Sequence, residues 1–210
     1  MELFFNWKDI KNKGRGLTFD DVLIVPAKSD VRSRKDPSLG TQLTKNKWME
    51  MPIISANMDT VTESPMAIAM DQLGGVGILH RFMTIEDQVK HVEKMKARGL
   101  TNISASIGVN DDYQDRARSL IKAGVNILTI DIAHGHSIQM FETVKWCKDH
   151  FSSIDIIAGN IATPEATENL IQAGADAGIL EHKEELADFV CRPIYTERWG
   201  IVRSPSIHHD

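Results

Sequence analysis

Two apolar runs in the middle of the chain end in polar residues that could do chemistry. The run VNILTIDIAHGHS delivers the carboxylate of Asp131, and the run IDIIAGNIATPEA delivers the amide of Asn160. Both runs are rich in aliphatic and β-branched residues, which is typical of parallel strands covered on both faces. Ligands of parallel α/β sheets bind beyond the carboxyl ends of the strands, and a carboxylate accepts hydrogen bonds in fixed directions. Asp131 and Asn160 are therefore candidates for a ligand site at one rim of a sheet.

Asp131 also has a simpler interpretation, as the cap of a helix that begins near Ser137. The residues alone leave both interpretations open. His134 and His136 flank Gly135 and suggest a metal site at first sight, but a pair spaced i, i+2 lacks a third ligand and favours loop structure. The final pair, His208 and His209, likewise lacks a scaffold. The sequence therefore predicts no metal site.

The elements that must position these residues repeat along the chain. From Met51 onward, strand-like and helix-like patterns alternate with a period of roughly 25 residues, which indicates consecutive βα units. The predicted strands are Pro52–Ser55, Gly75–His80, Ile103–Val109, Asn126–Asp131 and Asp155–Ala158. The predicted helices are Glu63–Leu73, Ile85–Arg98, Asp112–Ala123, Ser137–His150 and Pro164–Ala173. This pattern predicts an α/β fold of the TIM (β/α)8 barrel type, truncated to about five or six βα units.

Local signals support these boundaries. Thr84 precedes a helical pattern with Asp87 three residues later, a variant of the capping box. Thr163 precedes a proline at the first helical position of another helix. Helix-ending glycines at positions 99, 124 and 174 come shortly before the next strand. These short connections are typical of a singly wound barrel.

Composition narrows the class of protein. The 210 residues are 42% hydrophobic and 25% charged, as in an ordinary globular protein. A formal net charge of -5 without a Lys/Arg cluster argues against nucleic acid as a partner. Only Cys147 and Cys191 are present, and no stretch has the length of a membrane span or the regions of a signal peptide. We therefore expect no membrane partner and a reducing, cytoplasmic location.

Three segments differ in pattern. Residues 1–46 form an extended N-terminal segment that includes the short apolar run DDVLIVP, predicted to be a strand or plug. Residues 47–177 contain the partial βα barrel. Residues 178–210 form a divergent tail in which 181–190 are expected to make one or two amphipathic turns.

Five motifs resemble the IMP dehydrogenase/GMP reductase family and occur in family order between Leu17 and Ala177. They are LTFDDVLIVP (17–26), SANMDTVTESPMAIA (55–69), GILHRF (77–82), DIAHGHS (131–137) and AGNIATPEA (158–166). The branch is less direct, because SANMDTVTE and TQLTKN at 41–46 also resemble bacterial IMP dehydrogenases. Only about twenty residues separate Arg81 from Ile103, whereas typical IMP dehydrogenases insert regulatory modules there. Three features favour GMP reductase: the missing insertion, the motifs HRF, DIAHGHS and AGN, which resemble the reductase forms, and the pair Ser33-Arg34. The alternative is an IMP dehydrogenase that lacks the insertion.

The resemblance implies NADPH-dependent reductive deamination of GMP to IMP and ammonia by a homotetramer. A cysteine would attack purine C2, ammonia would leave, and hydride would reduce the covalent intermediate. By resemblance, two residues would contact the purine nucleotide, Asn57 and Met58. The residues that would contact the cofactor are Arg81, Asp131, Ile132, Ala133 and Asn160, together with Ser33 and Arg34, which would reach the cofactor of a neighbouring subunit. Simpler interpretations compete: Met58 as a core filler, Arg81 as a strand-end polar residue, and Arg32 with Arg34 as a solvated basic turn.

The chain departs from the family after Ala177. The sequence lacks three features that the resemblance implies: the glycine-rich loop with the nucleophilic cysteine, the monovalent cation site and the later phosphate-binding strands. We therefore interpret the chain as a truncation, frameshift or splice product. Cys191 lies in DFVCRPIY without adjacent glycines, and neither it nor the helical Cys147 is given a catalytic role. An unclosed barrel is expected to leave two sheet edges exposed and its apolar interior uncovered, with poor stability. The alternative function is therefore a non-catalytic fragment that associates with full-length subunits.

Overall fold

A computed structural model describes residues 28–110, 112–180 and 190–193. The chain divides into two compact units, Met1–Ser38 with Arg198–Asp210, and Leu39–Glu197. In the first unit the described segment contains a turn, in which the Asp36 carboxylate accepts the backbone N–H groups of Arg32 and Ser33 at 3.2 and 2.9 Å. Ser33 and Arg34 are exposed in this turn. The strand predicted at 20–26 lies outside the described residues, and so do the amphipathic turns predicted at 181–190 except for Val190, which is the first residue of a strand.

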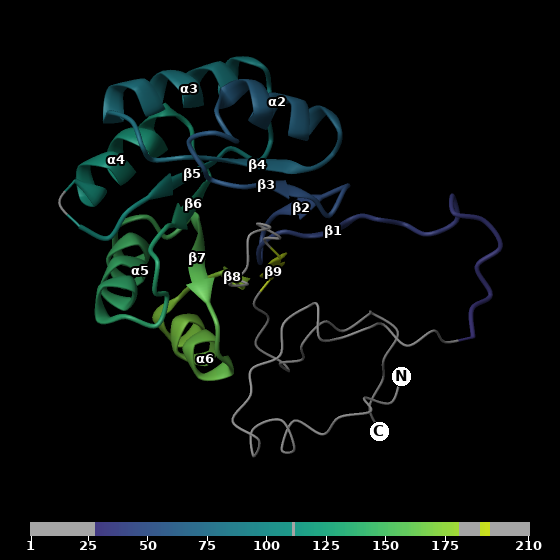
Figure 1. Ribbon diagram of the computed structural model, residues 1–210. Coiled ribbons are helices and arrows are strands. Elements are labelled where there is room, and N and C mark those ends of the chain that lie inside the picture. The colour runs from purple at the N-terminus through teal and green to yellow at the C-terminus, as the bar shows by residue number, and fades with distance from the viewer. Residues whose placement is uncertain (1–27, 111, 181–189, 194–210) are drawn as a thin grey trace. The chain divides into compact units, whose positions relative to one another are not determined.

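The second unit is built on a curled sheet whose strands follow one another in chain order (Figure 1). Its six parallel strands are β3 (Ile54–Ser55), β4 (Val76–Leu79), β5 (Ser104–Ile107), β6 (Ile127–Ile130), β7 (Asp155–Ile161) and β8 (Ala177–Leu180). A further strand, β9 (Val190–Pro193), pairs with β8 in antiparallel orientation. All five predicted strands are present. The partial barrel was predicted to end at residue 177, where the family motifs stop, but β8 continues to Leu180. The fold is thus a truncated barrel of the TIM type.

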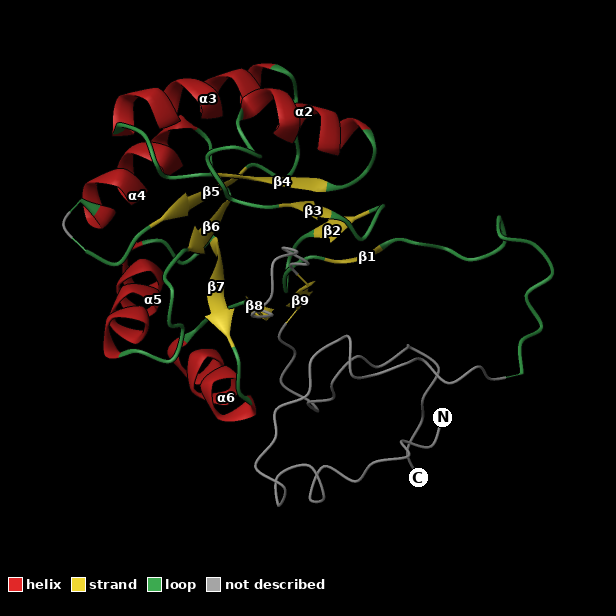
Figure 2. Cartoon of the chain, viewed as in Figure 1, coloured by secondary structure: helices red, strands yellow, loops and turns green. Residues whose placement is uncertain are grey.

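Five helices lie on the outer side of the curled sheet (Figure 2). They are α2 (Ser64–Gln72), α3 (Ile85–Ala97), α4 (Tyr113–Ala123), α5 (Ile138–His150) and α6 (Pro164–Ala173). The Thr84 hydroxyl accepts the N–H of Asp87, and the Thr163 hydroxyl accepts the N–H of Ala166, so both predicted caps are confirmed. Gly99, Gly124 and Gly174 have φ values of 81°, 129° and 108°, a region that favours glycine after a helix.

The interior of the curled sheet is filled, contrary to the expectation of an uncovered apolar interior. Residues 41–49 are not simply extended but form a hairpin of β1 (Thr41–Gln42) and β2 (Trp48–Met49). Its Leu43 and Met49 are buried against inward-facing apolar residues of the sheet, namely Val76, Ile78, Ile127, Ile157, Ala177 and Ile179. Thr44 and Asn46 bond the carboxylate of Asp155, where β7 begins. The hairpin therefore covers the interior at the amino-terminal end of the strands.

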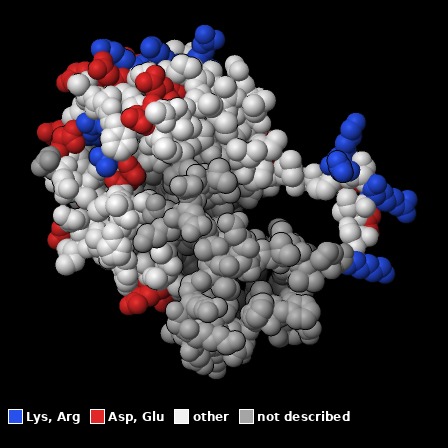
Figure 3. Space-filling model, viewed as in Figure 1, with Lys and Arg blue, Asp and Glu red and all other residues white. Residues whose placement is uncertain are grey.

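Acidic and basic side chains are interspersed over the outer helices (Figure 3). The described segment of the first unit is richer in basic residues, with Lys28, Arg32, Arg34 and Lys35. Within the described residues, no helix combines the length and the apolar character that a membrane span requires.

Candidate functional site

The parallel pairing brings the carboxyl ends of the strands to one rim. Asn57 follows β3, Arg81 follows β4, Asp131 follows β6, and Asn160 lies near the end of β7. Because every step from β3 to β8 is parallel, these residues share the rim opposite the hairpin. This is the rim at which barrels of this type bind their ligands.

Arg81 and Asp131 form the central contact of this rim. The Nε of Arg81 donates to Oδ2 of Asp131 at 3.0 Å, and the side chains are 33% and 20% exposed. The guanidinium also lies over the Phe82 ring, 4.9 Å from its centroid. Among the described residues, neither Oδ1 of Asp131 nor the terminal nitrogens of Arg81 make a hydrogen bond. A carboxylate oxygen and a cationic fork therefore remain available to a ligand.

Two glycines lie beside this pair. A side chain at Gly108 would have its Cβ 3.4 Å from Nη1 of Arg81, and one at Gly159 would come within 2.7 Å of the Ile130 carbonyl oxygen. The N–H of Asp131 donates to the carbonyl of Ile107 at 2.9 Å. The tips of β5, β6 and β7 consequently approach closely, and Asp131 is held by backbone on both sides.

The loop after β6 folds against the end of β7. The Gly135 N–H donates to the Asn160 carbonyl at 3.0 Å, and a Cβ at Gly135 would lie 2.6 Å from that oxygen. Ser137 caps α5 by accepting the N–H of Met140 at 3.3 Å. Asp131 is not the cap, so the simpler interpretation of this carboxylate is wrong. Beyond Asp131, Ile132 is half-buried and Ala133 is exposed.

Asn160 has the one positive φ, 55°, among the described non-glycine residues. The predicted strand ended at Ala158, but β7 continues to Ile161, with a register irregularity between these residues. Left-handed residues and bulges are enriched beside functional sites, because they re-aim the chain. The contact observed at Asn160 is made by its carbonyl. A cofactor role for its side-chain amide stays a prediction.

Asn57 and Met58 follow β3 in a tight turn. The Met58 carbonyl accepts the N–H groups of Val61 and Thr62, both at 3.0 Å, while its thioether side chain is 42% exposed. Asn57 is 7% exposed. Met58 is therefore not a core filler, and its sulfur is available at the rim where the resemblance places the purine.

His80 is a buried polar residue that the sequence did not single out. It is 3% exposed, and its Nδ1 accepts the N–H of Phe82 at 3.1 Å. An accepting Nδ1 places the proton of the neutral ring on Nε2. This Nε2 is buried without a hydrogen-bond partner in the described part, 3.8 Å from a carboxylate oxygen of Glu63. His91 lies 3.8 Å from the other oxygen of Glu63, so two imidazoles flank one carboxylate.

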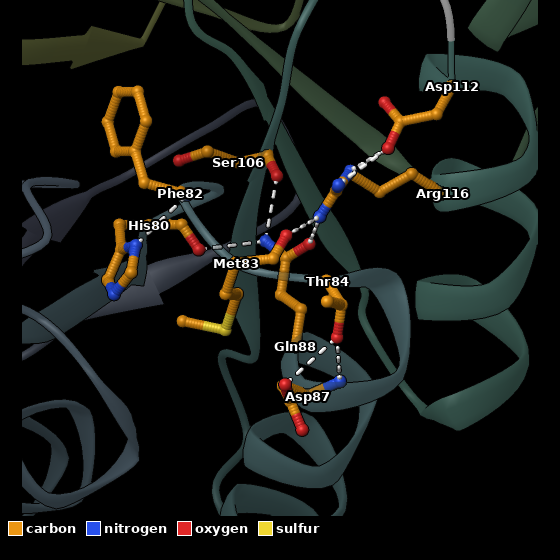
Figure 4. A network of polar contacts seen from close by, with 9 residues as sticks. All are labelled: His80, Phe82, Met83, Thr84, Asp87, Gln88, Ser106, Asp112 and Arg116. Atoms are coloured by element: carbon orange, nitrogen blue, oxygen red, sulfur yellow. Dashed lines mark hydrogen bonds and ion pairs between the residues drawn. The ribbon is translucent and has the colours of Figure 1, made fainter.

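A buried network below the rim ties β4 to β5 (Figure 4). The Nε2 of Gln88 donates to the carbonyls of His80 and Ser106 at 3.0 and 2.9 Å, and its Oε1 accepts from Nη1 of Arg116 at 2.8 Å. Arg116 also donates to the Met83 carbonyl at 3.1 Å. The network therefore fixes both strand ends and the segment that carries Arg81. This network could have been found from the sequence, because Gln88 is a polar residue on the apolar face of its helix, beside Val92 and Met95.

Cys147 is the cysteine whose side chain the structure describes, and the described residues contain no metal cluster. Burial raises the pKa of the Cys147 thiol to about 12, so this helical cysteine is protonated and unreactive at neutral pH. No three His, Cys, Asp or Glu side chains of the described residues are arranged to hold a metal ion. His136 contacts Asn169 at 3.2 Å and packs edge-on against Phe141. The backbone of Cys191 lies in β9, away from any glycine-rich loop.

A curled parallel βα sheet with a polar rim defines a barrel protein that takes its ligand at the carboxyl ends of the strands. Residues 16–179 match the model of the "IMP dehydrogenase / GMP reductase domain", and the chain belongs to this family. Inosine-5'-monophosphate dehydrogenase of Cryptosporidium parvum is 39% identical over 208 aligned positions, which cover 79% of this chain and 51% of that protein. The Borreliella burgdorferi protein of the same name is 38% identical, with 76% and 52% covered. The chain thus spans about half the length of these relatives.

The names of these relatives differ from the branch that the motifs favour. The Bacillus subtilis relative, 30% identical over 288 aligned positions, is also named an inosine-5'-monophosphate dehydrogenase. In each of the three alignments the positions outnumber the residues of this chain that they cover, so each relative carries residues that this chain lacks. None of these three names is GMP reductase.

Proposed function

We propose that the chain is the cofactor-side half of a nicotinamide-dependent oxidoreductase that acts on purine nucleotides. The observation that carries this proposal is the Arg81–Asp131 pair at the barrel rim, 3.0 Å apart and partly buried, with hydrogen-bonding capacity left on both partners. A guanidinium can recognise a carboxylate or phosphate through two parallel hydrogen bonds, so the terminal nitrogens of Arg81 suit an anionic group of a ligand.

These residues fit a dinucleotide. The free Oδ1 of Asp131 can accept from ribose hydroxyls or a carboxamide, and the terminal nitrogens of Arg81 suit an anionic group. Gly159 lets the end of β7 pack against the Ile130 carbonyl, next to Asp131, because a Cβ there would come within 2.7 Å of that oxygen. The bound cofactor supplies hydride transfer, while the residues of this chain bind and orient it. Met58, with its exposed thioether, can lie against the purine.

The test is titration of the 210-residue chain with NADPH and with NADH, after circular dichroism shows that the variants fold. Asp131→Ala removes an acceptor and should raise the dissociation constant roughly ten- to hundredfold, or about 1.5–3 kcal/mol. Asp115→Ala, at a carboxylate that is 83% exposed on α4, is the matched control and should bind like wild type. Equal affinities for wild type and Asp131→Ala would refute the proposal. Binding is expected to be weak, because few contacts offset the entropic cost of association.

Two activities are candidates for the whole enzyme. IMP dehydrogenase, which would oxidise IMP with NAD, is favoured by the names of the Cryptosporidium parvum and Borreliella burgdorferi relatives. GMP reductase, which would use NADPH and release ammonia, is favoured by the motifs HRF, DIAHGHS and AGN and by the exposed pair Ser33-Arg34. The preference between NADH and NADPH in the titration discriminates them. Assembly into a homotetramer, a cytoplasmic location and the roles of Ile132, Ala133 and Asn160 belong to the same proposal.

A further inference from the structure

The segment that follows β3 is hydrogen-bonded to the segment that follows β4. The Met58 carbonyl accepts the N–H of Thr62 at 3.0 Å, and the Thr62 carbonyl accepts the N–H of His80 at 3.3 Å. Nδ1 of His80 accepts the N–H of Phe82 at 3.1 Å (Figure 4). The Phe82 ring lies under the guanidinium of Arg81. Continuous contacts therefore join Met58, proposed to contact the purine, to Arg81, proposed to contact the cofactor.

Glu63 adds a carboxylate to this connection. It is the residue before α2, and within the described residues its side chain makes no cap hydrogen bond to that helix. One carboxylate oxygen lies 3.8 Å from Nε2 of His80, and the other lies 3.8 Å from Nε2 of His91. The side chain is 50% exposed, so the carboxylate has room to move.

Both imidazoles direct a donor toward this carboxylate. Nδ1 of His91 accepts the N–H of Ser64 at 3.3 Å, as Nδ1 of His80 accepts that of Phe82. A neutral imidazole whose Nδ1 is an acceptor carries its proton on Nε2. Nε2 of His80 is buried and has no hydrogen-bond partner among the described residues. Because a buried donor without an acceptor is costly, the carboxylate of Glu63 is the group that would satisfy it.

We propose that Glu63 is a positioning residue that couples purine-nucleotide binding to cofactor binding. A shift of roughly 1 Å brings its carboxylate within hydrogen-bonding distance of the His80 Nε2–H. A nucleotide that packs on Met58 moves the turn at 58–62 as one unit, because two backbone hydrogen bonds close this turn, and Glu63 is the next residue. The new bond fixes the His80 ring and, through its aromatic neighbour, the guanidinium of Arg81. This inference rests on the proposed function.

Coupling of this kind is reciprocal and can be measured as a ratio of affinities. The experiment titrates the 210-residue chain with NADPH alone, with saturating GMP and with saturating IMP. In wild type, one of the two nucleotides should lower the dissociation constant for NADPH about fivefold or more. Glu63→Ala removes the acceptor and should bring this factor close to one. Glu63→Gln retains an acceptor oxygen and should keep part of the factor.

Glu86→Ala is the matched control and should keep the wild-type factor, because Glu86 is an exposed carboxylate in the first turn of α3. Circular dichroism checks that each variant folds. Nuclear magnetic resonance of isotope-labelled histidine supplies a second measurement, which packing alone would not change. The His80 Nε2 signal should move when the nucleotide is added to wild type and stay in place in Glu63→Ala.

The outcomes separate this inference from the function on which it rests. If wild type binds NADPH and neither nucleotide changes its affinity, the coupling is overturned while the proposed function stands. An equal factor in wild type and Glu63→Ala would overturn it in the same way, as would a His80 ring that carries its proton on Nδ1. If wild type binds no NADPH, the proposed function fails and the coupling fails with it.

Discussion

The imidazole of His80 is fixed in one tautomer by the backbone next to Arg81. Its Nδ1 accepts the Phe82 N–H, and the Phe82 ring stacks on it at 6.2 Å between centroids. Phe82 in turn supports the Arg81 guanidinium, which bonds Asp131. His80 is thus a positioning residue that acts on the candidate site through its neighbours.

His80→Asn and His80→Leu separate this role from simple packing. An Asn side-chain oxygen can replace Nδ1 as the acceptor, so His80→Asn should keep the Phe82 amide protected from hydrogen exchange. His80→Leu leaves that N–H unpaired, which should lower the free energy of unfolding by about 1–3 kcal/mol and speed exchange at Phe82 roughly tenfold or more. His134→Leu, in the exposed loop, is the control. Equal protection in the Asn and Leu variants would contradict the assignment.

Cys147 makes the stability of the fold depend on pH in the alkaline range. Burial, the larger influence, raises its pKa to about 12, and the charge of Lys148 lowers it by less. An unfolded thiol titrates near 8.5. Above that value the unfolded chain releases a proton that the folded chain keeps, so this group favours unfolding increasingly from about pH 9 toward pH 12.

The free energy of unfolding should therefore fall with rising pH by up to about 1.4 kcal/mol per pH unit more in wild type than in Cys147→Ala. Urea unfolding at pH 8, 9, 10 and 11 measures both slopes, and the difference between them cancels lysine and tyrosine titration. The two proteins should show the same slope below pH 8. Identical slopes above pH 9 would mean that Cys147 is not buried in solution.

At the scale of elements, β4 and β5 are joined through one side chain of α3. Gln88 satisfies the carbonyls of His80 and Ser106 and the guanidinium of Arg116 at once, while it is fully buried. Removing it takes a buried donor from the carbonyls of His80 and Ser106, whereas Arg116 keeps its bonds to the Met83 carbonyl and to Asp112. Such networks stabilise a fold only when every member is satisfied.

Gln88→Ala should lower the free energy of unfolding by about 1–3 kcal/mol, chiefly because the buried carbonyls of His80 and Ser106 lose the donor that Gln88 supplies. Gln114→Ala is the matched control, since the one hydrogen bond of this half-buried side chain within the described residues goes to the neighbouring Tyr113 hydroxyl at 3.1 Å. Chemical denaturation of both variants measures the difference. A loss at Gln88 no larger than at Gln114 would show that water replaces the network.

The elements themselves could be predicted because their signals are local. Thr84, Thr163 and the helix-ending glycines mark boundaries through backbone hydrogen bonds that involve only a few residues. The hairpin at 41–49 could not be predicted, because Leu43 and Met49 gain their burial from strands far along the chain. The same holds at the site. The tips that carry Arg81 and Asp131 could be predicted to share a rim, but their contact depends on tertiary packing, such as the network at Gln88 that holds the segment around Arg81.

At the scale of the whole molecule, the hairpin changes what a partial barrel can do. With Leu43 and Met49 inside, the described inward-facing residues of the sheet are buried, as a stable core requires. The polar rim and the hairpin occupy opposite ends of the strands. Cofactor-side residues can therefore be ordered without the later strands, while the chemistry that the family resemblance assigns to a cysteine loop has no counterpart in the described residues.

The purified 210-residue chain should accordingly show neither GMP-dependent oxidation of NADPH nor IMP-dependent reduction of NAD. Of its two cysteines, Cys147 is buried with a raised pKa and Cys191 lies outside a glycine-rich context. Loss of the nucleophile in covalent catalysis typically costs on the order of 10⁴-fold or more. Absorbance at 340 nm with each nucleotide pair measures turnover, and the intact Cryptosporidium parvum relative is the positive control. Turnover by the wild-type chain that disappears in Cys191→Ala would contradict the prediction, because it would identify Cys191 as the nucleophile.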